Sequence, residues 1–127
     1  YSRLRSGTKI ANNSQIGTFV EIKKSTIGSG CKINHMAFIG DAILGDDVII
    51  GAGTITCNHD GNDTQQTIIH SGSYIGSNVN LIAPIVIEEN AIIGAGSTIT
   101  ENAPKNKLTL SRSKQVTIGN RDKTKSK

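Results

Sequence analysis

A branched aliphatic residue recurs at a step of six along most of this chain, and this spacing constrains the fold more than any other feature. The series runs through Ile10, Ile16, Ile22, Ile27, Ile33, Ile39, Leu44 and Ile50, and resumes at Ile69, Ile75, Leu81, Ile87, Ile93 and Ile99. The step shortens to five between Ile22 and Ile27 and between Ile39 and Leu44. Neither the helical period of about 3.6 nor the alternation of a strand produces this pattern. A six-residue unit fits one short strand and a corner, and three such units complete a triangular coil. The sequence therefore predicts an all-β fold, a parallel β-helix of hexapeptide repeats.

The composition agrees with this fold and narrows the function. Hydrophobic residues make up only 35% of the 127 residues, which suits a solenoid with a narrow core. Aromatic residues are scarce and Trp is absent, so we expect no nucleic-acid partner. No apolar run approaches the ~20 residues that span a membrane, and no signal peptide is visible. Two cysteines are too few for a disulfide framework, which favours a reduced, cytoplasmic protein. The chain starts at Tyr1 without Met, so we expect it to be the C-terminal part of a longer protein.

Stacking three units per coil predicts two columns of side chains. The inner column contains Ile16, Ile33, Ile50, Ile75 and Ile93. Two residues after each of these lie Thr18, His35, Ala52, Ser77 and Ala95, which we call the small-residue column. His35 is its one large member. Because neighbouring coils lie about 4.8 Å apart, the column from His35 to Ala95 is roughly 14 Å long. This arrangement predicts a strip for a long, thin ligand with His35 at one end.

The repeat is interrupted once, and polar residues fill the interruption. The step from Thr56 to Ile69 is thirteen residues where the repeat allows six, so about seven residues must leave the coil as a loop within 57–68. The loop begins with Cys57, Asn58, His59 and Asp60, and we expect it to bring Asn58 and His59 alongside the small-residue column at Ala52. Loops on rigid scaffolds often carry function. The alternative is that these residues only form polar turns.

Five segments resemble a known family. They are GTFVEIKKSTIGSG, INHMAFIGDAILGDDVIIGAGTITCNHDG, LIAPIVI, IIGAGSTIT and LSRSKQ, and the resemblance around them covers nearly the whole chain, failing only in the last ten or so residues. They resemble the C-terminal domain of the GlmU family, bifunctional bacterial enzymes with N-acetylglucosamine-1-phosphate uridylyltransferase and glucosamine-1-phosphate N-acetyltransferase activities. The resemblance implies a left-handed β-helix and a homotrimer that binds acetyl-CoA between neighbouring subunits. It also implies acetyl transfer to the amine of glucosamine-1-phosphate, giving N-acetylglucosamine-1-phosphate for UDP-N-acetylglucosamine and cell-envelope synthesis.

The resemblance assigns roles to individual residues. His35 matches the catalytic base, which would take a proton from the attacking amine. Arg5 and Lys23 match ligands of the sugar phosphate. Phe38 and Asn58 match further residues of the acceptor site. The positions that match coenzyme contacts are Ala52, Asn58, His59, Ser77, Ala95 and Arg112. No residue is assigned to a metal ion.

Four positions depart from the family pattern. Phe38 and His59 stand where the family usually has Tyr, Ile49 where it has Asn, and Thr64 where it has Lys. The departures at Phe38 and Ile49 concern the acceptor, so its identity is less firmly implied than acetyl-CoA binding. Two alternatives therefore stay open: a hexapeptide acyltransferase with a different amino-sugar acceptor, and a non-catalytic module that only trimerises.

A zinc enzyme like the γ-class carbonic anhydrases is a further alternative, because such enzymes use three His ligands on a similar β-helix. The chain has His35, His59 and His70, but their spacing lacks the close pair that such a site requires. The sequence therefore argues against it.

The C-terminal segment is basic and accounts for the net charge of +4 and the pI near 9.2. We expect the β-helix to occupy residues 1–104 and an arm with a basic tail to occupy 105–127. Arg112 is expected to reach toward an adjacent subunit. Residues after Gly119 are expected to be mobile.

Overall fold

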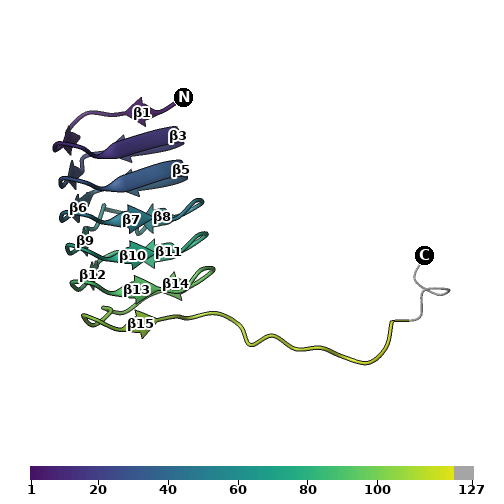
Figure 1. Ribbon diagram of the computed structural model, residues 1–127. Coiled ribbons are helices and arrows are strands. Elements are labelled where there is room, and N and C mark those ends of the chain that lie inside the picture. Colours follow the sequence, from purple (N-terminus) through teal and green to yellow (C-terminus); the bar gives the residue numbers. More distant parts are fainter. Residues whose placement is uncertain (122–127) are drawn as a thin grey trace.

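The structure, a computed structural model, describes residues 1–121, and Figure 1 shows short strands stacked into a prism. All strand pairs of the two named sheets are parallel, and no helix occurs between residues 1 and 121. The prediction of an all-β parallel β-helix is confirmed, and the arrangement is consistent with a left-handed coil. Since the described part of the chain has no helix, it also has none long and apolar enough to cross a membrane.

The prism has three faces, which the chain visits in turn. Face 1 consists of β2 (Lys9–Ile10), β4 (Thr26–Ile27), β6 (Ala42–Leu44), β9 (Thr67–Ile69) and β12 (Ile85–Ile87). Face 2 consists of the first halves of β3 (Gln15–Lys23) and β5 (Lys32–Gly40), then β7 (Ile49–Ile50), β10 (Tyr74–Ile75), β13 (Ile92–Ile93) and β15 (Leu108–Thr109). Face 3 consists of β1 (Arg3–Leu4), the second halves of β3 and β5, then β8 (Ile55–Cys57), β11 (Asn80–Ile82) and β14 (Thr98–Ile99). Strands β3 and β5 therefore bend from face 2 onto face 3.

The inner column predicted from the repeat is present. Ile16 pairs with Ile33, Ile33 with Ile50, Ile50 with Ile75, and Ile75 with Ile93. Ile33 and Ile75 are completely buried, and similar columns line the other two faces. Each such side chain contributes about 1.5–3 kcal/mol when fully buried. A narrow stack of Ile, Leu and Val therefore holds the coils together.

Glycine allows the backbones of successive coils to stack closely at a corner. At Gly51, a Cβ atom would lie 2.5 Å from the carbonyl carbon of Gly76 on the next coil. That space is too small for any side chain, which explains why Gly follows the core Ile at this corner. Close stacking of this kind keeps the register between coils fixed, so that side chains two residues apart form parallel columns.

A loop leaves the prism between face 3 and face 1. Strand β8 ends at Cys57 and β9 begins at Thr67, so residues 58–66 lie outside the coil. At the other end of the chain, β15 pairs with β13, and the Thr98 N–H donates to the Ser111 carbonyl. The coil thus continues to residue 111, beyond the expected boundary at 104.

The segment after the last coil is exposed throughout residues 112–121 and runs away from the prism in Figure 1. The expectation of mobility after Gly119 falls mostly on residues 122–127, which lie outside the described residues.

Candidate active site

The small-residue column lies at the corner between faces 2 and 3, which we call the His35 corner. Thr18 and His35 are paired residues of β3 and β5. Backbone hydrogen bonds continue the stack, with Asn78 N donating to Ala52 O at 2.7 Å and Gly96 N donating to Ser77 O at 2.9 Å. All five members of the column are exposed. The column therefore forms an outer edge of the prism that a ligand can reach from solvent.

Arg112 lies at the far end of this column. Its Nη1 atom donates to the carbonyl oxygen of Ala95 at 2.8 Å. Its side chain is thus held against its own chain, and the guanidinium carries further N–H groups that an anion can accept. Three of the residues assigned to the coenzyme, Ser77, Ala95 and Arg112, are brought together here.

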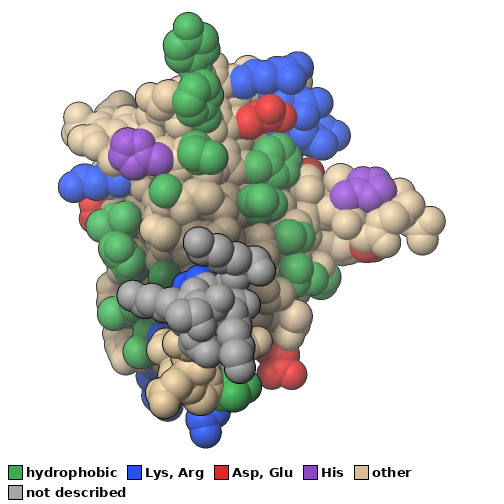
Figure 2. Space-filling model, turned by 90° about the vertical axis from the view of Figure 1, so that its right-hand side faces the viewer, with side chains coloured by type: hydrophobic (Ala, Val, Ile, Leu, Met, Phe, Trp, Pro, Cys, Tyr) green, Lys and Arg blue, Asp and Glu red, His purple; other side chains and the backbone are tan. Residues whose placement is uncertain are grey.

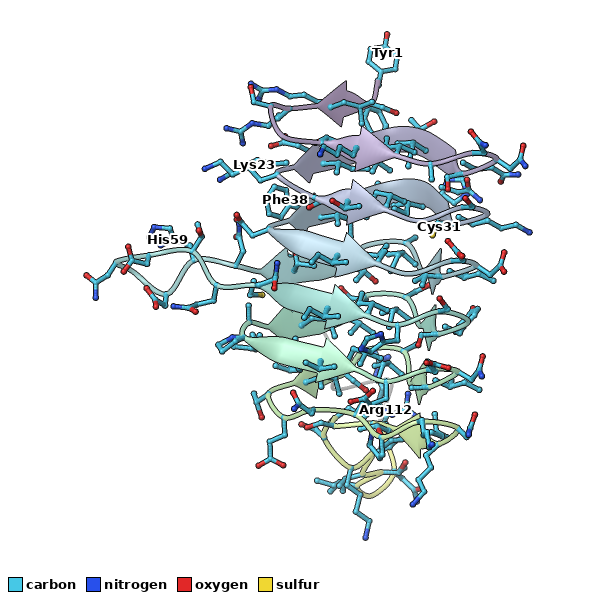
Figure 3. The ribbon with its side chains drawn as sticks, turned by 90° about the vertical axis from the view of Figure 1, so that its left-hand side faces the viewer. Tyr1, Lys23, Cys31, Phe38, His59 and Arg112 are labelled. Atoms are coloured by element: carbon cyan, nitrogen blue, oxygen red, sulfur yellow. The ribbon has the colours of Figure 1, made fainter. Side chains whose placement is uncertain are left out.

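A second cluster lies at the corner between faces 3 and 1, where the loop leaves, and we call it the loop corner. Asn58 donates from Nδ2 to Asp41 Oδ2 at 2.6 Å. A Cβ atom on Gly40 would lie 2.7 Å from the Phe38 ring and 2.8 Å from Asn58 Nδ2, so the ring and the amide both pack over Gly40. Lys23 pairs with Gly40 on the adjacent coil. Figure 3 shows Lys23 and Phe38 on the side from which the loop with His59 projects.

A basic hollow of about 500 Å³ borders this second cluster. Its lining residues are Arg3, Leu4, Arg5, Ser6, Lys23 and Lys24. Arg5 pairs with Glu21, with 3.0 Å between Nη1 and Oε2, and both side chains are more than a third exposed. Such an exposed pair contributes little stability. The four cationic side chains make the hollow suited to an anionic group such as a phosphate.

The loop has internal structure of its own. His59 and Thr64 form an antiparallel bridge, and Gln65 N donates to Asn58 O at 2.6 Å. Asp60 Oδ1 accepts from the backbone N–H groups of Asp63 at 2.8 Å and Asn62 at 2.9 Å. These two bonds lower the pKa of the Asp60 carboxyl, and the bond from Asp63 has the larger effect. The loop is therefore a small closed turn rather than a loose segment.

His59 takes part in this turn. Its Nδ1 atom accepts a hydrogen bond from Gly61 N at 3.0 Å. This bond occupies Nδ1, so Nε2 is the ring nitrogen that remains to contact a ligand.

The position of the loop corrects one expectation. We expected Asn58 and His59 to lie beside Ala52, but Ala52 precedes β8 whereas Asn58 follows it. In one chain, β8 therefore carries the backbone across face 3 before the loop leaves. Lys23 is also distant from His35. It pairs with Gly40, which follows His35 by five residues on β5 and so lies up to roughly 17 Å from it along the strand.

One chain thus brings the predicted residues into two groups. The loop corner gathers the residues assigned to the acceptor, which are Arg5, Lys23, Phe38 and Asn58. The His35 corner holds His35, Ala52, Ser77, Ala95 and Arg112. His59 extends from the loop corner, and Ile49 lies on face 2 with 36% of its surface exposed.

Sequence reasoning missed Gly40 and Asp41. Their signal was the five-residue step between Ile39 and Leu44, which makes a tighter corner at this point. Within residues 1–121, no three His, Cys, Asp or Glu side chains gather as a possible metal site. His70 instead pairs with Glu88, with 3.9 Å between Nε2 and Oε2.

Comparison with known proteins identifies the repeats. Residues 66–101 match the family described as bacterial transferase hexapeptide (six repeats). The bifunctional protein GlmU of Carboxydothermus hydrogenoformans is 57% identical over 91% of this chain and 26% of its own length. GlmU of Thermosipho africanus is 56% identical over 93% of this chain and 26% of its own length, and GlmU of Marinobacter nauticus is 50% identical over 98% and 28%. The chain thus spans about a quarter of the length of these curated relatives.

Solved structures with about 20% sequence identity share the fold. A mutant of AntD, an N-acyltransferase from Bacillus cereus, solved with dTDP-4-amino-4,6-dideoxyglucose and coenzyme A, has a TM-score of 0.78 over 89% of this chain and 78% of its own, with 20% identity. The acetyltransferase domain of PglB from Neisseria gonorrhoeae, solved with acetyl coenzyme A, has a TM-score of 0.76 over 84% and 50%, with 19% identity. From its repeats, its β-helix and its similarity to these relatives, the chain corresponds to the C-terminal hexapeptide-repeat domain of the bifunctional GlmU proteins, as its sequence predicts.

Proposed function

We propose that this chain transfers an acetyl group from acetyl-CoA to the amine of glucosamine-1-phosphate. The observation that carries the proposal is the 57% identity to a GlmU protein across 91% of the chain, a region that includes both corners of face 3. The product, N-acetylglucosamine-1-phosphate, would serve the synthesis of UDP-N-acetylglucosamine. The two cysteines form no disulfide, which supports a reduced, cytoplasmic setting for the reaction.

In the proposed reaction, His35 is the general base. The amine nitrogen attacks the thioester carbonyl while the imidazole accepts a proton from it. The carbon–sulfur bond then breaks, and the coenzyme thiolate leaves and takes the proton from the imidazolium. The exposure of His35, next to Ala52 in the small-residue column, supports this role, because both substrates can reach its ring.

The coenzyme would lie along the small-residue column. Ala52, Ser77 and Ala95 present little side-chain bulk, so an extended pantetheine arm can approach the backbone closely. Arg112 at the end of the column offers a cation to the coenzyme phosphates. This arrangement directs the thioester toward His35. In this proposal acetyl-CoA is a co-substrate, and no residue of the chain is assigned as a metal ligand.

The acceptor would bind at the loop corner. Arg5 and Lys23 in the basic hollow would hold its phosphate, and the Phe38 ring would pack against the sugar. Asn58 would contact both the acceptor and the donor. Phe38 lacks a hydroxyl and Ile49 lacks a polar group, so other amino sugars with an anionic group are the second candidate acceptors.

The separation of the two corners supports a site that is completed by a second copy of the chain. The amine and the phosphate of glucosamine-1-phosphate lie on adjacent ring carbons, so the base and the phosphate ligands must both be near the sugar. One chain places His35 and Lys23 at opposite edges of face 3. We therefore propose that the His35 corner of one subunit faces the loop corner of its neighbour.

Exposed apolar surfaces support a closed trimer. Ile49, Tyr74, Ile92 and Leu108 are paired neighbours along face 2, and each is more than a third exposed. On face 3, Phe19, Met36, Phe38 and Ile55 line a shallow hollow of about 470 Å³. Figure 2 shows hydrophobic side chains running in strips along the prism. Exposed apolar strips often mark contacts between chains, and a contact between two different faces gives a closed ring when the rotation between subunits closes.

The proposal is tested by following free thiol released from acetyl-CoA. With glucosamine-1-phosphate, the wild-type chain should release thiol well above the rate without acceptor. Unphosphorylated glucosamine should be a much poorer acceptor, because it lacks the group for the basic hollow. Release only with another amino sugar would indicate a different acceptor. No release from a folded trimer would contradict the proposal and favour a non-catalytic trimerisation module.

A further inference from the structure

We infer that Asp41 is a positioning residue of the acceptor site, which fixes the side-chain amide of Asn58 so that its oxygen faces the acceptor amine. This inference rests on the proposed function and adds a residue to it. Asp41 lies between β5 and β6 and directly precedes a face 1 strand, so it is not a member of the small-residue column.

The backbone holds Asp41 rigidly. Its φ angle is +50°, in the left-handed region that Asp and Asn adopt more readily than other residues with a side chain. Its N–H donates to the Lys23 carbonyl at 3.0 Å, and its carbonyl accepts from Thr67 N at 3.1 Å. Asp41 is therefore tied to the coil that bears the phosphate ligand and to the end of the loop.

The stacking of coils places Asn58 against Asp41. Phe38 on β5 pairs with Ile55 on β8, and two residues further along Gly40 lies level with Cys57. The next residues, Asp41 and Asn58, therefore also lie level with each other. Asn58 Nδ2 donates to Asp41 Oδ2 at 2.6 Å, and both side chains are half-buried. A bond this short between an amide and a carboxylate is charge-assisted and stronger than a neutral one.

The chemistry of the partner fixes the direction of the amide. A carboxylate only accepts hydrogen bonds, so the NH₂ end of Asn58 must face Asp41. The oxygen of the same amide then points away from Asp41. An oxygen in that position accepts an N–H from the acceptor amine, which leaves the nitrogen lone pair free to attack the thioester. Without Asp41, the amide can turn and present NH₂ to the amine, which repels the N–H it should bind.

Gly40 supports the same arrangement from below. A Cβ atom there would collide with the Phe38 ring and with Asn58 Nδ2, as described above. The Gly40–Asp41 pair thus forms a floor that seats the ring and the amide together. The two residues contact other side chains of the site rather than the reacting atoms.

The test is the substitution Asp41→Asn in the full chain. Asn tolerates the left-handed conformation and keeps the volume and the backbone hydrogen bonds, but its amide can accept or donate. We expect kcat/KM for glucosamine-1-phosphate to fall about 10-fold, as for the loss of one charge-assisted hydrogen bond, while the KM for acetyl-CoA stays unchanged. The matched control is Asp47→Asn, because Asp47 also has a positive φ of 56° but lies between faces 1 and 2. It should behave as wild type.

A double-mutant cycle separates positioning from a general structural effect. In an Asn58→Ala background, Asp41→Asn should cause no further loss. An equal loss in both backgrounds, or activity of Asp41→Asn within twofold of wild type, would overturn the inference and leave the proposed function standing. A wild-type protein that transfers no acetyl group would contradict the proposed function and, with it, this inference.

A measurement on the wild-type protein needs no variant. The Asn58 side-chain amide protons should exchange with solvent more slowly than those of Asn62, which is exposed in the loop. Equal exchange rates for the two amides, followed by nitrogen-15 NMR, would contradict the hydrogen bond to Asp41.

Discussion

His35 and Lys23 lie at opposite edges of face 3, because Lys23 pairs with Gly40, five residues further along β5 than His35. The proposed base and the proposed phosphate ligand are thus on the same face of one chain but cannot reach the same sugar. In the proposed function, the catalytic site is therefore completed only when two chains assemble. The separation also gives the individual residues distinct, testable roles.

Replacing His35 by Ala should remove the general base. We expect kcat to fall roughly 10²- to 10⁴-fold, the usual contribution of general base catalysis, with little change in acetyl-CoA affinity. Steady-state thiol release and direct coenzyme binding would measure the two effects. His70→Ala is the control, because His70 is on face 1 and should leave turnover unchanged. A loss smaller than tenfold for His35→Ala would remove His35 from the role.

Replacing His59 distinguishes packing from proton transfer. His59→Tyr keeps a flat ring and should leave activity within a few-fold of wild type. His59→Ala removes the ring and the bond from Gly61, and should weaken coenzyme binding by about 1 kcal/mol, the value of lost packing contacts. Isothermal titration with coenzyme A would measure this. If His59→Tyr abolished turnover while His35→Ala did not, the base would lie in the loop.

Acid should open the loop, because Asp60 holds it through its ionised carboxylate. The pKa of Asp60 is lowered from its ordinary 3.8 by the bonds from Asp63 and Asn62. Its contribution to loop order is therefore complete above the ordinary pKa and is lost as the pH falls through the lower, folded value. The amide signals of residues 62 and 63, followed by NMR, should shift with a midpoint below 3.8. A midpoint at or above that value would contradict the assignment. Asp60→Asn should remove the transition.

Thr67 offers a stabilising substitution. Its Oγ1 atom is buried and has no hydrogen-bond partner within residues 1–121. Thr67→Val replaces this hydroxyl with a methyl group of similar size, so the free energy of unfolding should rise by about 1 kcal/mol. Thr54→Val is the matched control, because Thr54 Oγ1 donates to Gly76 O at 3.0 Å and its loss should destabilise. Urea unfolding of both variants would measure the two changes in the free energy of unfolding. Equal destabilisation would show that Thr67 has a partner in solution.

The repeat predicts the interior of the fold well. Three units per coil fix which residues stack, so the column from Ile16 to Ile93 and the exposed column containing His35 follow from spacing alone. The prediction that the loop lies beside Ala52 was wrong, because a six-residue unit also carries the chain across one whole face. Asn58 is one unit after Ala52 and therefore lies at the next corner.

The contact between Asp41 and Asn58 could have been found from the sequence. The five-residue step at Ile39 makes the coil seventeen residues long, and Asn58 follows Asp41 at that interval. Contacts between chains, unlike this contact within the chain, do not follow from the spacing of the repeat. The repeat constrains inward-facing residues, whereas outward-facing positions such as Tyr74 and Ile92 lie outside its spacing rule. Spacing alone therefore cannot predict how copies assemble.

Subunit complementation tests the central claim most directly. We consider two variants, His35→Ala and the double variant Arg5→Ala/Lys23→Ala, each of which should be nearly inactive alone. They should be co-expressed in equal amounts and purified as mixed trimers. If one subunit supplies His35 and its neighbour supplies the phosphate ligands, random assembly should restore about a quarter of wild-type turnover, because half of the subunits carry each intact corner. If both corners of one chain formed the site, no chain in the mixture would be intact. Turnover no higher than that of the separate variants would then contradict the account.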